Sequence, residues 1–382
     1  MTRKRKSKPQ KRTLPLSTKI RLLLNSLFAL ALAGSYLASV VDPKLCWFIS
    51  FLGLAYPILF CFNLIFVIYW LFKQPKFALI SFVAILIGIH FLLSYIGFRE
   101  QTAIGVPKSS QQFIRVMTYN VHEFKKFGDK NTVQAKDEFL KIIREEQPDV
   151  ICFQEFFTRV KNNYDFKKAI SKILNTSHYY YKPTKGNNYE TAGMAIFSKF
   201  PIVSTGVIKF EKHNNNEVIF ADIKTPKRVF RVYNVHLQSI RFQPEDYKYL
   251  SEVKKKMNTN MQSSRRIGAR LKQAFIKRSD QVKALKQHSQ KCAMPYLLMG
   301  DFNDTPISYT VNKILSGGLI NTFRAKGSGL GITYNGDFPN FQIDYILASP
   351  SFAVKNYRII EKKVSDHYAV RSDLELLEDT TH

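Results

Sequence analysis

The chain begins with three long stretches that contain no Asp, Glu, Lys or Arg, and its pattern changes after about residue 110. The uncharged stretches run from Leu22 to Val41, from Leu45 to Phe72 and from Phe77 to Phe98. Each reaches the roughly 20 residues that a helix needs to cross a bilayer. They predict a membrane region of three transmembrane helices, because a cleaved signal peptide would have one short apolar core.

Cations are distributed unevenly around these stretches. Nine lysines and arginines lie in residues 1–21, Lys73 and Lys76 lie between the second and third stretches, and only Lys44 lies in the first loop. Because short cation-rich loops stay in the cytoplasm, we expect a cytoplasmic basic tail and an extracytoplasmic segment after three crossings. A kink or re-entrant turn at Pro57 or Asn63 would reverse this multi-pass topology.

After a polar linker at residues 99–112, short apolar runs of strand length are mixed with helical periodicity. Because the two do not strictly alternate, they favour a mixed, layered α/β domain over a simple doubly wound sheet. We expect a helix at 137–147, another at 268–290, and an irregular basic segment at 241–266. Strands are expected at 114–121, 149–155, 194–198, 218–223, 229–237, 296–300, 343–348 and 368–374.

The net charge of the 382 residues is +28. Nine cations of the tail and a surplus of three in residues 22–110 leave +16 for the rest of the chain. Two interpretations stay open, a lysine-rich surface that keeps the domain soluble, or a surface for a polyanion or an anionic membrane. The four cysteines lack metal-type spacing and are expected to be buried thiols.

Polar residues of catalytic type follow the ends of several apolar runs. A rigid sheet fixes such residues in place, while the loop that follows stays open to substrate. One acid, Asp344, lies within an apolar run and needs a partner if buried, because an unpaired buried carboxylate costs several kcal/mol. The runs and their polar ends are TYNV at 118–121, FQE at 153–155, NVHL at 234–237, GDFND at 300–304, IDYI at 343–346 and SDHY at 365–368.

Glu155 and Asp366 offer hard oxygen ligands within this set. Such ligands suit Mg²⁺ or Mn²⁺, whereas a zinc site would be expected to contain more histidine and cysteine. The sequence therefore predicts a divalent-metal site of the magnesium type.

Taken in order, these motifs resemble those of the endonuclease/exonuclease/phosphatase superfamily, which includes deoxyribonucleases, neutral sphingomyelinases and inositol polyphosphate phosphatases. The resemblance covers residues 113–376. It implies a four-layer α/β sandwich of two packed mixed β-sheets flanked by helices, here preceded by about three transmembrane helices. It also implies a metal-dependent phosphoric ester hydrolase with its site at one edge of the sandwich.

The resemblance divides the candidate side chains into two groups. Those implied to hold Mg²⁺ or Mn²⁺ are Asn120, Glu155 and Asp366. Those implied to act on water and the phosphate are His236, Asp301, Asn303, Asp344 and His367. Two points stay open: whether His367 or Asp301 takes the proton from water, and which acid lies behind His236, for which Glu190 is a poorly spaced candidate.

Neither the motifs nor the resemblance specify the substrate. The positive charge favours a phosphodiesterase that acts on nucleic acid. The membrane region favours a phospholipid or sphingolipid phosphodiesterase instead, although the soluble part contains no long aromatic hairpin that could enter a bilayer. A phosphomonoesterase and a non-catalytic binding module are the remaining alternatives.

Overall fold

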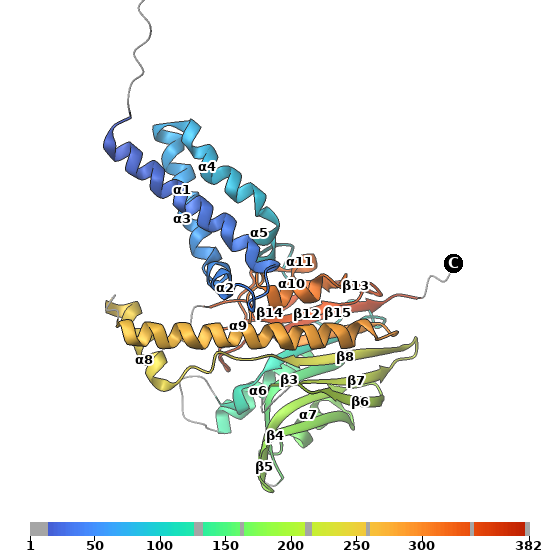
Figure 1. The fold of residues 1–382 in the computed structure, drawn as a ribbon. Helices are drawn as coiled ribbons and strands as arrows, with labels where there is room; N and C mark the ends of the chain where they lie inside the picture. Colours follow the sequence, from blue (N-terminus) through green and yellow to red (C-terminus); the bar gives the residue numbers. More distant parts are fainter. Residues whose placement is uncertain are drawn as a thin grey trace, which may run out of the picture.

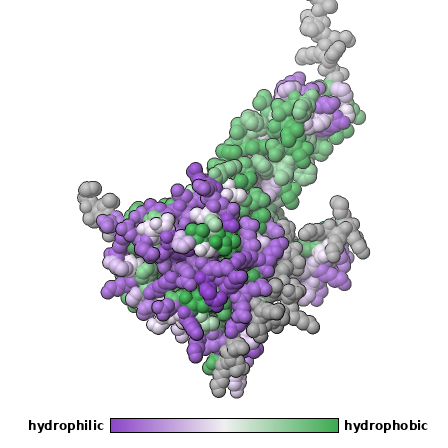
Figure 2. Space-filling view, turned by 180° about the vertical axis from the view of Figure 1, so that it is seen from behind, coloured by the Kyte–Doolittle hydropathy of each residue, from purple (hydrophilic) through white to green (hydrophobic). Residues whose placement is uncertain are grey.

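The computed structural model describes residues 14–125, 133–160, 164–210, 216–256, 260–336 and 340–378. Its first helices project as a stalk from a globular domain, and this stalk is apolar over most of its visible surface (Figures 1 and 2). We call residues 16–95 the helical stalk. It consists of α1 (Leu16–Tyr36), η1 (Leu37–Ser39), α2 (Trp47–Leu54), α3 (Tyr56–Lys73), α4 (Pro75–Ile87) and α5 (Ile89–Tyr95).

Two helical segments of the stalk, Leu16–Ser39 and Tyr56–Lys73, are long and apolar enough to cross a membrane. The third apolar stretch forms α4 and α5, which meet at an angle of 62°. The bend lies at Gly88, where an added Cβ would come within 2.1 Å of the Tyr36 ring, so the close approach of α1 requires glycine. The second stretch is also divided, because α2 ends at Leu54 and α3 starts again with a proline in its first turn.

Three polar side chains meet inside the stalk. Ser81 Oγ donates to Asn63 Oδ1 over 2.7 Å and contacts Asn25 Oδ1 at 2.5 Å, and all three residues are fully buried. Asn63 Nδ2 in turn donates to the carbonyl of Phe28. Each residue belongs to a different helix, so these bonds join α1, α3 and α4, and they satisfy polar groups that would be costly in hydrocarbon.

The globular domain contains two β-sheets. In each, parallel and antiparallel pairs are mixed. The first sheet has the order β10 (Ile320–Asn321), β12 (Asp344–Ala348), β9 (Tyr296–Asp301), β8 (Val229–His236), β7 (Val218–Lys224) and β6 (Ile202–Ile208). The second has the order β13 (Phe352–Val354), β15 (Ala369–Leu376), β2 (Ile114–Asn120), β3 (Val150–Arg159), β5 (Glu190–Ser198) and β4 (His178–Gly186), with β14 (Arg358–Ile360) also paired to β15.

The two sheets pack face to face around one core, to which apolar side chains such as Val116 and Cys152 contribute from one sheet and Val232 and Met299 from the other. Two further cores lie under helices on the outer faces. The domain is therefore the expected α/β sandwich of four layers. Its helices are η2 (His122–Phe124), α6 (Val133–Glu146), α7 (Phe166–Leu174), α8 (Pro244–Lys256), α9 (Met261–Gln290), α10 (Tyr309–Leu315) and α11 (Thr322–Lys326).

Several contacts dock the stalk on the domain, among them the following. Strand β1 (Ile96–Phe98) directly follows α5 and pairs with β11 (Ser328–Leu330) of the domain. Asp42, in the loop before α2, bonds to Ser279 and Lys283 of α9. Ile307, six residues after Asp301, is fully buried among apolar residues of the stalk. The domain therefore packs directly against the stalk.

Two segments differ from what the sequence indicated. Residues 96–98, at the end of the third apolar stretch, form a strand because β11 offers them a partner. Residues 241–266, expected to be irregular, contain α8 and the start of α9. The carboxylate of Asp246 accounts for this order, since it is fully buried and bonds to Arg266 and Arg270 across 20 or more residues.

Candidate active site

Strand register brings the candidate side chains to one end of both sheets. In the first sheet β8 and β9 are parallel and pair His236 with Asp301, while antiparallel β12 pairs Asp344 with Asp301. In the second sheet β2 and β3 are parallel and pair Asn120 with Gln154, the residue before Glu155. Three strands of one sheet and two of the other therefore present their polar ends to a common space.

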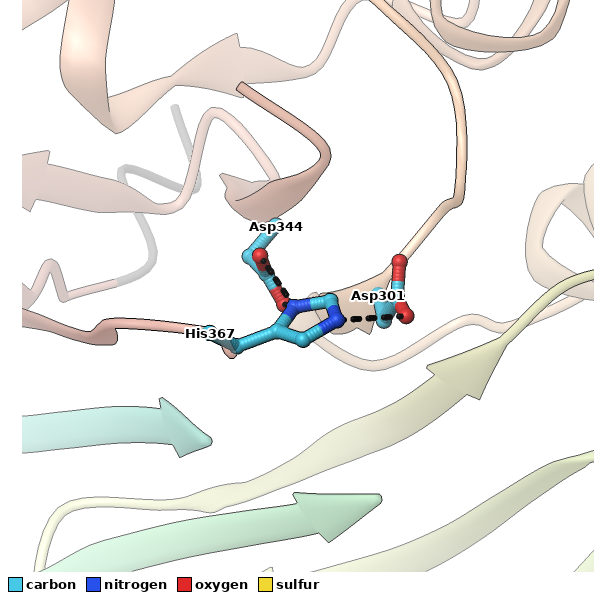
Figure 3. A group of neighbouring side chains, drawn as sticks. All are labelled: Asp301, Asp344 and His367. Carbon is cyan, nitrogen blue, oxygen red and sulfur yellow. Dashed lines mark hydrogen bonds and ion pairs between the residues drawn. The ribbon is translucent and has the colours of Figure 1, made fainter. Parts of the chain in front are cut away.

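His367 lies between two buried carboxylates (Figure 3). Its Nδ1 is 3.0 Å from Asp344 Oδ2, and its Nε2 is 3.8 Å from Asp301 Oδ2. The side chains of all three residues are at most 6% exposed. Asp344 is thus the buried acid with a histidine partner, and its contact with Nδ1 fixes the orientation of the ring.

Asp301 occupies the centre of the site. Its Oδ2 accepts hydrogen bonds from Asn120 Nδ2 at 3.1 Å and from Asn303 Nδ2 at 3.0 Å. The same oxygen lies 3.9 Å from His236 Nε2. Two amides and two imidazoles therefore surround one carboxylate oxygen, which places Asp301 within reach of a small molecule bound between them.

Glu155 and Asp366 form a second acidic group beside the first. Their carboxylates lie 3.6 and 3.8 Å from Nδ1 of His122, and Glu155 also lies 3.8 Å from Nε2 of His236. Ser365 Oγ donates a hydrogen bond to the carbonyl oxygen of Asn120. This bond joins the end of β2 to the loop that carries Asp366. Two carboxylates thus converge, one from β3 and one from the loop before β15.

Backbone strain is concentrated at this end of the sheets. His122, Glu155 and Asn303 have φ angles of 43°, 53° and 54°, in the left-handed region that side chains other than glycine rarely adopt. Gly300 approaches β8 so closely that an added Cβ would lie 2.0 Å from the carbonyl oxygen of Val235. Such strain of order 1–3 kcal/mol per residue is typical of functional sites.

Burial and neighbouring charges shift the pKa values of these groups in different directions. Burial raises the pKa of Asp301 to about 7. Burial alone would also raise the pKa of Glu155, but the adjacent imidazoles of His122 and His236 lower it to about 2. Burial would lower the pKa of His367, but Asp344 and Asp301 raise it well above its usual value. The site therefore combines an ionised Glu155 with a protonated imidazole.

Two groups of side chains in the site could hold a cation. Asp301, Asp344 and His367 each offer one ligand atom within 4.8 Å of the others. In that group, however, both ring nitrogens of His367 already face carboxylates, so the buried charges are compensated within the group. Glu155 and Asp366, with the amide oxygen of Asn120 nearby, are the hard oxygen donors that Mg²⁺ and Mn²⁺ prefer, and this donor set fits such an ion better.

These side chains line a cavity of about 210 Å³. Seven of the predicted residues line it: Asn120, Glu155, His236, Asp301, Asn303, Asp366 and His367. Asp344 lies behind His367. Arg241 and Arg278 add positive charge, and an apolar wall includes Leu54 of the stalk. The structure thus brings together every side chain singled out from the sequence, while their chemical roles stay predictions.

His122 and Tyr334 also line the cavity but were not singled out from the sequence. His122 lies two residues beyond Asn120 in the same strand end, which is a signal that could have identified it. Tyr334 packs its ring edge to face with His367, and no motif marks it. The candidate partner of His236, Glu190, bonds instead to Arg159 at 2.7 Å, and His236 faces Glu155 and Asp301.

Comparison with known proteins is consistent with this arrangement. A sequence model described as the Endonuclease/Exonuclease/phosphatase family matches residues 117–367. A second model, described as a domain of unknown function (DUF8431), matches residues 18–95. No curated protein gives a significant match.

Several solved structures are similar to part of this chain. An endonuclease/exonuclease/phosphatase from Beutenbergia cavernae DSM 12333 has a TM-score of 0.51 and 18% identity, covering 69% of this chain and 72% of that one. The human Nocturnin catalytic domain with bound sulfate has a TM-score of 0.48 and 18% identity, and the match covers 69% of this chain and 95% of that one. A mannosyl-6-phosphatase from Bacteroides thetaiotaomicron VPI-5482 has a TM-score of 0.43 and 16% identity, and the match covers 68% of this chain and 99% of that one.

Proposed function

The chain belongs to the endonuclease/exonuclease/phosphatase family, and we propose that it is a membrane-anchored, divalent-metal-dependent phosphodiesterase. The observation that carries this proposal is the convergence of the carboxylates of Glu155, Asp301 and Asp366 with two amides and three imidazoles on one cavity. Glu155, Asp366 and Asn120 would hold Mg²⁺ or Mn²⁺. When bound, such an ion stabilises the negative charge that develops on the phosphoryl oxygens.

The remaining side chains have separate tasks in this mechanism. A water molecule attacks phosphorus opposite the leaving oxygen, the bond from phosphorus to that oxygen breaks, and a phosphomonoester and an alcohol are formed. Asp301, held by Asn120 and Asn303, takes a proton from the water. His236 and His367 donate to the phosphoryl oxygens, and Asp344 holds the His367 ring in place. The leaving oxygen takes up a proton from solvent water, and Asp301 then releases its proton to solvent, so that one water molecule is consumed in all.

The activity can be tested with the full chain in detergent and bis-(p-nitrophenyl) phosphate as a soluble diester. We expect release of nitrophenol that requires Mg²⁺ or Mn²⁺ and stops with EDTA. His367→Ala should lower kcat by about 10²-fold or more, because a charged donor to the phosphate is lost. Hydrolysis that is insensitive to EDTA, or full activity of His367→Ala, would contradict the mechanism.

The arrangement of the stalk supports the topology expected from the cations. Arg21 near the start of α1 donates to Tyr69 near the end of α3, so Lys19 and Arg21 lie at the same end of the stalk as the Lys73–Lys76 turn. The domain is docked at the opposite end (Figure 1). If the stalk crosses a bilayer, the basic end is cytoplasmic and the domain is extracytoplasmic.

This topology predicts the behaviour of reporters fused to the C-terminus. An alkaline phosphatase reporter, which folds only in an oxidising compartment, should be active there. A green fluorescent protein exported through the same secretory route should be dark. The reverse result would place the domain in the cytoplasm and exclude the proposed topology.

Nucleic acid stays the substrate class that the net charge favours. Several cations of α9, however, are engaged within the molecule. Arg266 and Arg270 bond to Asp246, Arg278 to Asp304, and Lys283 to Asp42. These four cations stabilise α8, the loop that contains Asp304, and the stalk. Because they are already paired with carboxylates, they are less available to bind the phosphates of a nucleic acid.

A further inference from the structure

The cavity has two chemically different walls. One consists of the carboxylates, amides and imidazoles described above. The other is apolar and is formed by side chains from three parts of the chain: α2 of the stalk, the segment after β8, and α9. Its members are Leu54, Ile240, Phe242, Leu271 and Phe275.

The apolar wall is continuous with the stalk. The rings of Phe51 in α2 and Phe275 in α9 meet edge to face with their centroids 5.4 Å apart. Phe51 and Leu54 also pack with Ile240 and Phe242 against the buried apolar residues of α9. A path of apolar side chains therefore leads from α2, at the end of the stalk next to the domain, into the cavity that holds Asp301 and His367.

The first two residues of α2, which precede this path, are not required to fill a core. Trp47 and Phe48 at the start of α2 are 41% and 55% exposed. Lys272 of α9 lies over the Trp47 ring, with Nζ 4.6 Å from its centroid. An aromatic residue beside a lysine is typical of the interface between hydrocarbon and water, so the start of α2 and the facing part of α9 present side chains suited to that interface.

We propose that this apolar wall binds the hydrocarbon part of a membrane lipid whose phosphodiester lies at the polar wall. The proposal rests on the proposed function and adds its substrate class, a phosphodiester lipid that enters from the bilayer along α2. Because Leu54 belongs to the stalk, the membrane anchor is then a part of the substrate site. Hydrolysis of the diester yields a phosphomonoester and an alcohol, of which one keeps the hydrocarbon chains.

The proposal is tested with the full chain reconstituted in vesicles of phosphatidylcholine, phosphatidylglycerol and sphingomyelin, each carrying a radiolabelled headgroup. Glycerophosphocholine, glycerophosphoglycerol and a single-stranded oligonucleotide serve as phosphodiesters without hydrocarbon chains. We expect Mg²⁺-dependent release of label from at least one of the three lipids, with a kcat/KM well above that for its chain-free counterpart and for the oligonucleotide.

The matched variants are Leu54→Ser and Leu45→Ser. Leu54 lines the cavity, whereas Leu45, in the loop before α2, is 85% exposed. Leu54→Ser should lower the ratio of kcat/KM for the lipid to that for bis-(p-nitrophenyl) phosphate about tenfold, which corresponds to the loss of one apolar side chain from a binding wall. Leu45→Ser should keep the ratio of the unchanged protein. Ile240→Ser, on the domain side of the same wall, gives a second measurement if Leu54→Ser does not fold.

The outcomes separate the two proposals. Absence of any metal-dependent diester hydrolysis, soluble substrate included, would overturn the proposed function. Metal-dependent hydrolysis of the soluble diester with no preference for lipid, or with faster cleavage of the oligonucleotide, would overturn only the lipid site. Equal ratios for Leu54→Ser, Ile240→Ser and Leu45→Ser would also overturn it.

Discussion

Asp301→Asn should lower kcat by about 10²–10⁴-fold, the contribution typical of a positioned general base. Asn keeps the size of the side chain, and its one oxygen can still accept from the side-chain amides of Asn120 and Asn303, although the bond from the Asn303 backbone amide to Oδ1 is lost. It cannot take a proton from water. Since Asp301 Oδ2 is bonded to Asn120 and Asn303 and faces both catalytic histidines, no adjacent group occupies the same position. Steady-state kinetics with a soluble diester at saturating Mg²⁺ measures the loss.

Asp165→Asn is the matched control for this prediction. Asp165 caps the N-terminus of α7, where its carboxylate accepts from the amide of Lys168, and Asn caps helices equally well. We expect its kcat to equal that of the unchanged protein. If Asp301→Asn retained full activity while its Mg²⁺ affinity was unchanged, the role of base would pass to His367.

Glu155→Gln should weaken Mg²⁺ or Mn²⁺ binding by at least about 100-fold, because even residues that only support a metal ligand contribute 10–100-fold. The substitution removes the charge that holds the cation and keeps the shape of the side chain. It also removes one of the two anions that His122 and His236 each face, the one at 3.6 and 3.8 Å respectively. Isothermal titration calorimetry with each metal measures the affinity, independently of turnover.

Glu190→Gln provides the comparison. Glu190 is partly exposed and bonds to Arg159 at the surface of the second sheet. Its substitution should leave both metal affinity and turnover unchanged. Undiminished Mg²⁺ binding in Glu155→Gln would contradict the proposed metal site. It would favour Asp301, Asp344 and His367 as the ligands instead.

The sequence identified the strand ends because they depend on local pattern. An apolar run of strand length followed by Asn, Glu, Asp or His is visible without any knowledge of distant contacts. Asn120 and Asp301 were therefore placed correctly at the ends of β2 and β9. Glu155 was expected to end its strand, but it lies within β3, at the irregularity between Phe153 and Phe156. That these ends meet was expected from the resemblance, and register explains it, since parallel strands end at the same edge.

The contacts between stalk and domain could not be predicted in this way. Ile307 looks like an ordinary loop residue in the sequence, yet it is fully buried among side chains of the stalk. Asp42 finds its partners in α9, more than 230 residues away. Likewise, α8 is ordered by the pairing of Asp246 with distant arginines, which hydrophobic periodicity does not reveal. Only the folded arrangement shows such long-range pairs.

The pairing of β1 with β11 fixes how far the enzyme can reach. Backbone hydrogen bonds to the domain begin one residue after α5 ends, so the chain has no slack between the stalk and the catalytic end of the sheets. A flexible tether would let a domain search the surrounding solution, whereas in the proposed membrane-anchored enzyme this rigid mount would confine the domain to molecules that diffuse past in the plane of the bilayer. For such an enzyme the rate of encounter depends on the surface density of its substrate and on the fluidity of the membrane.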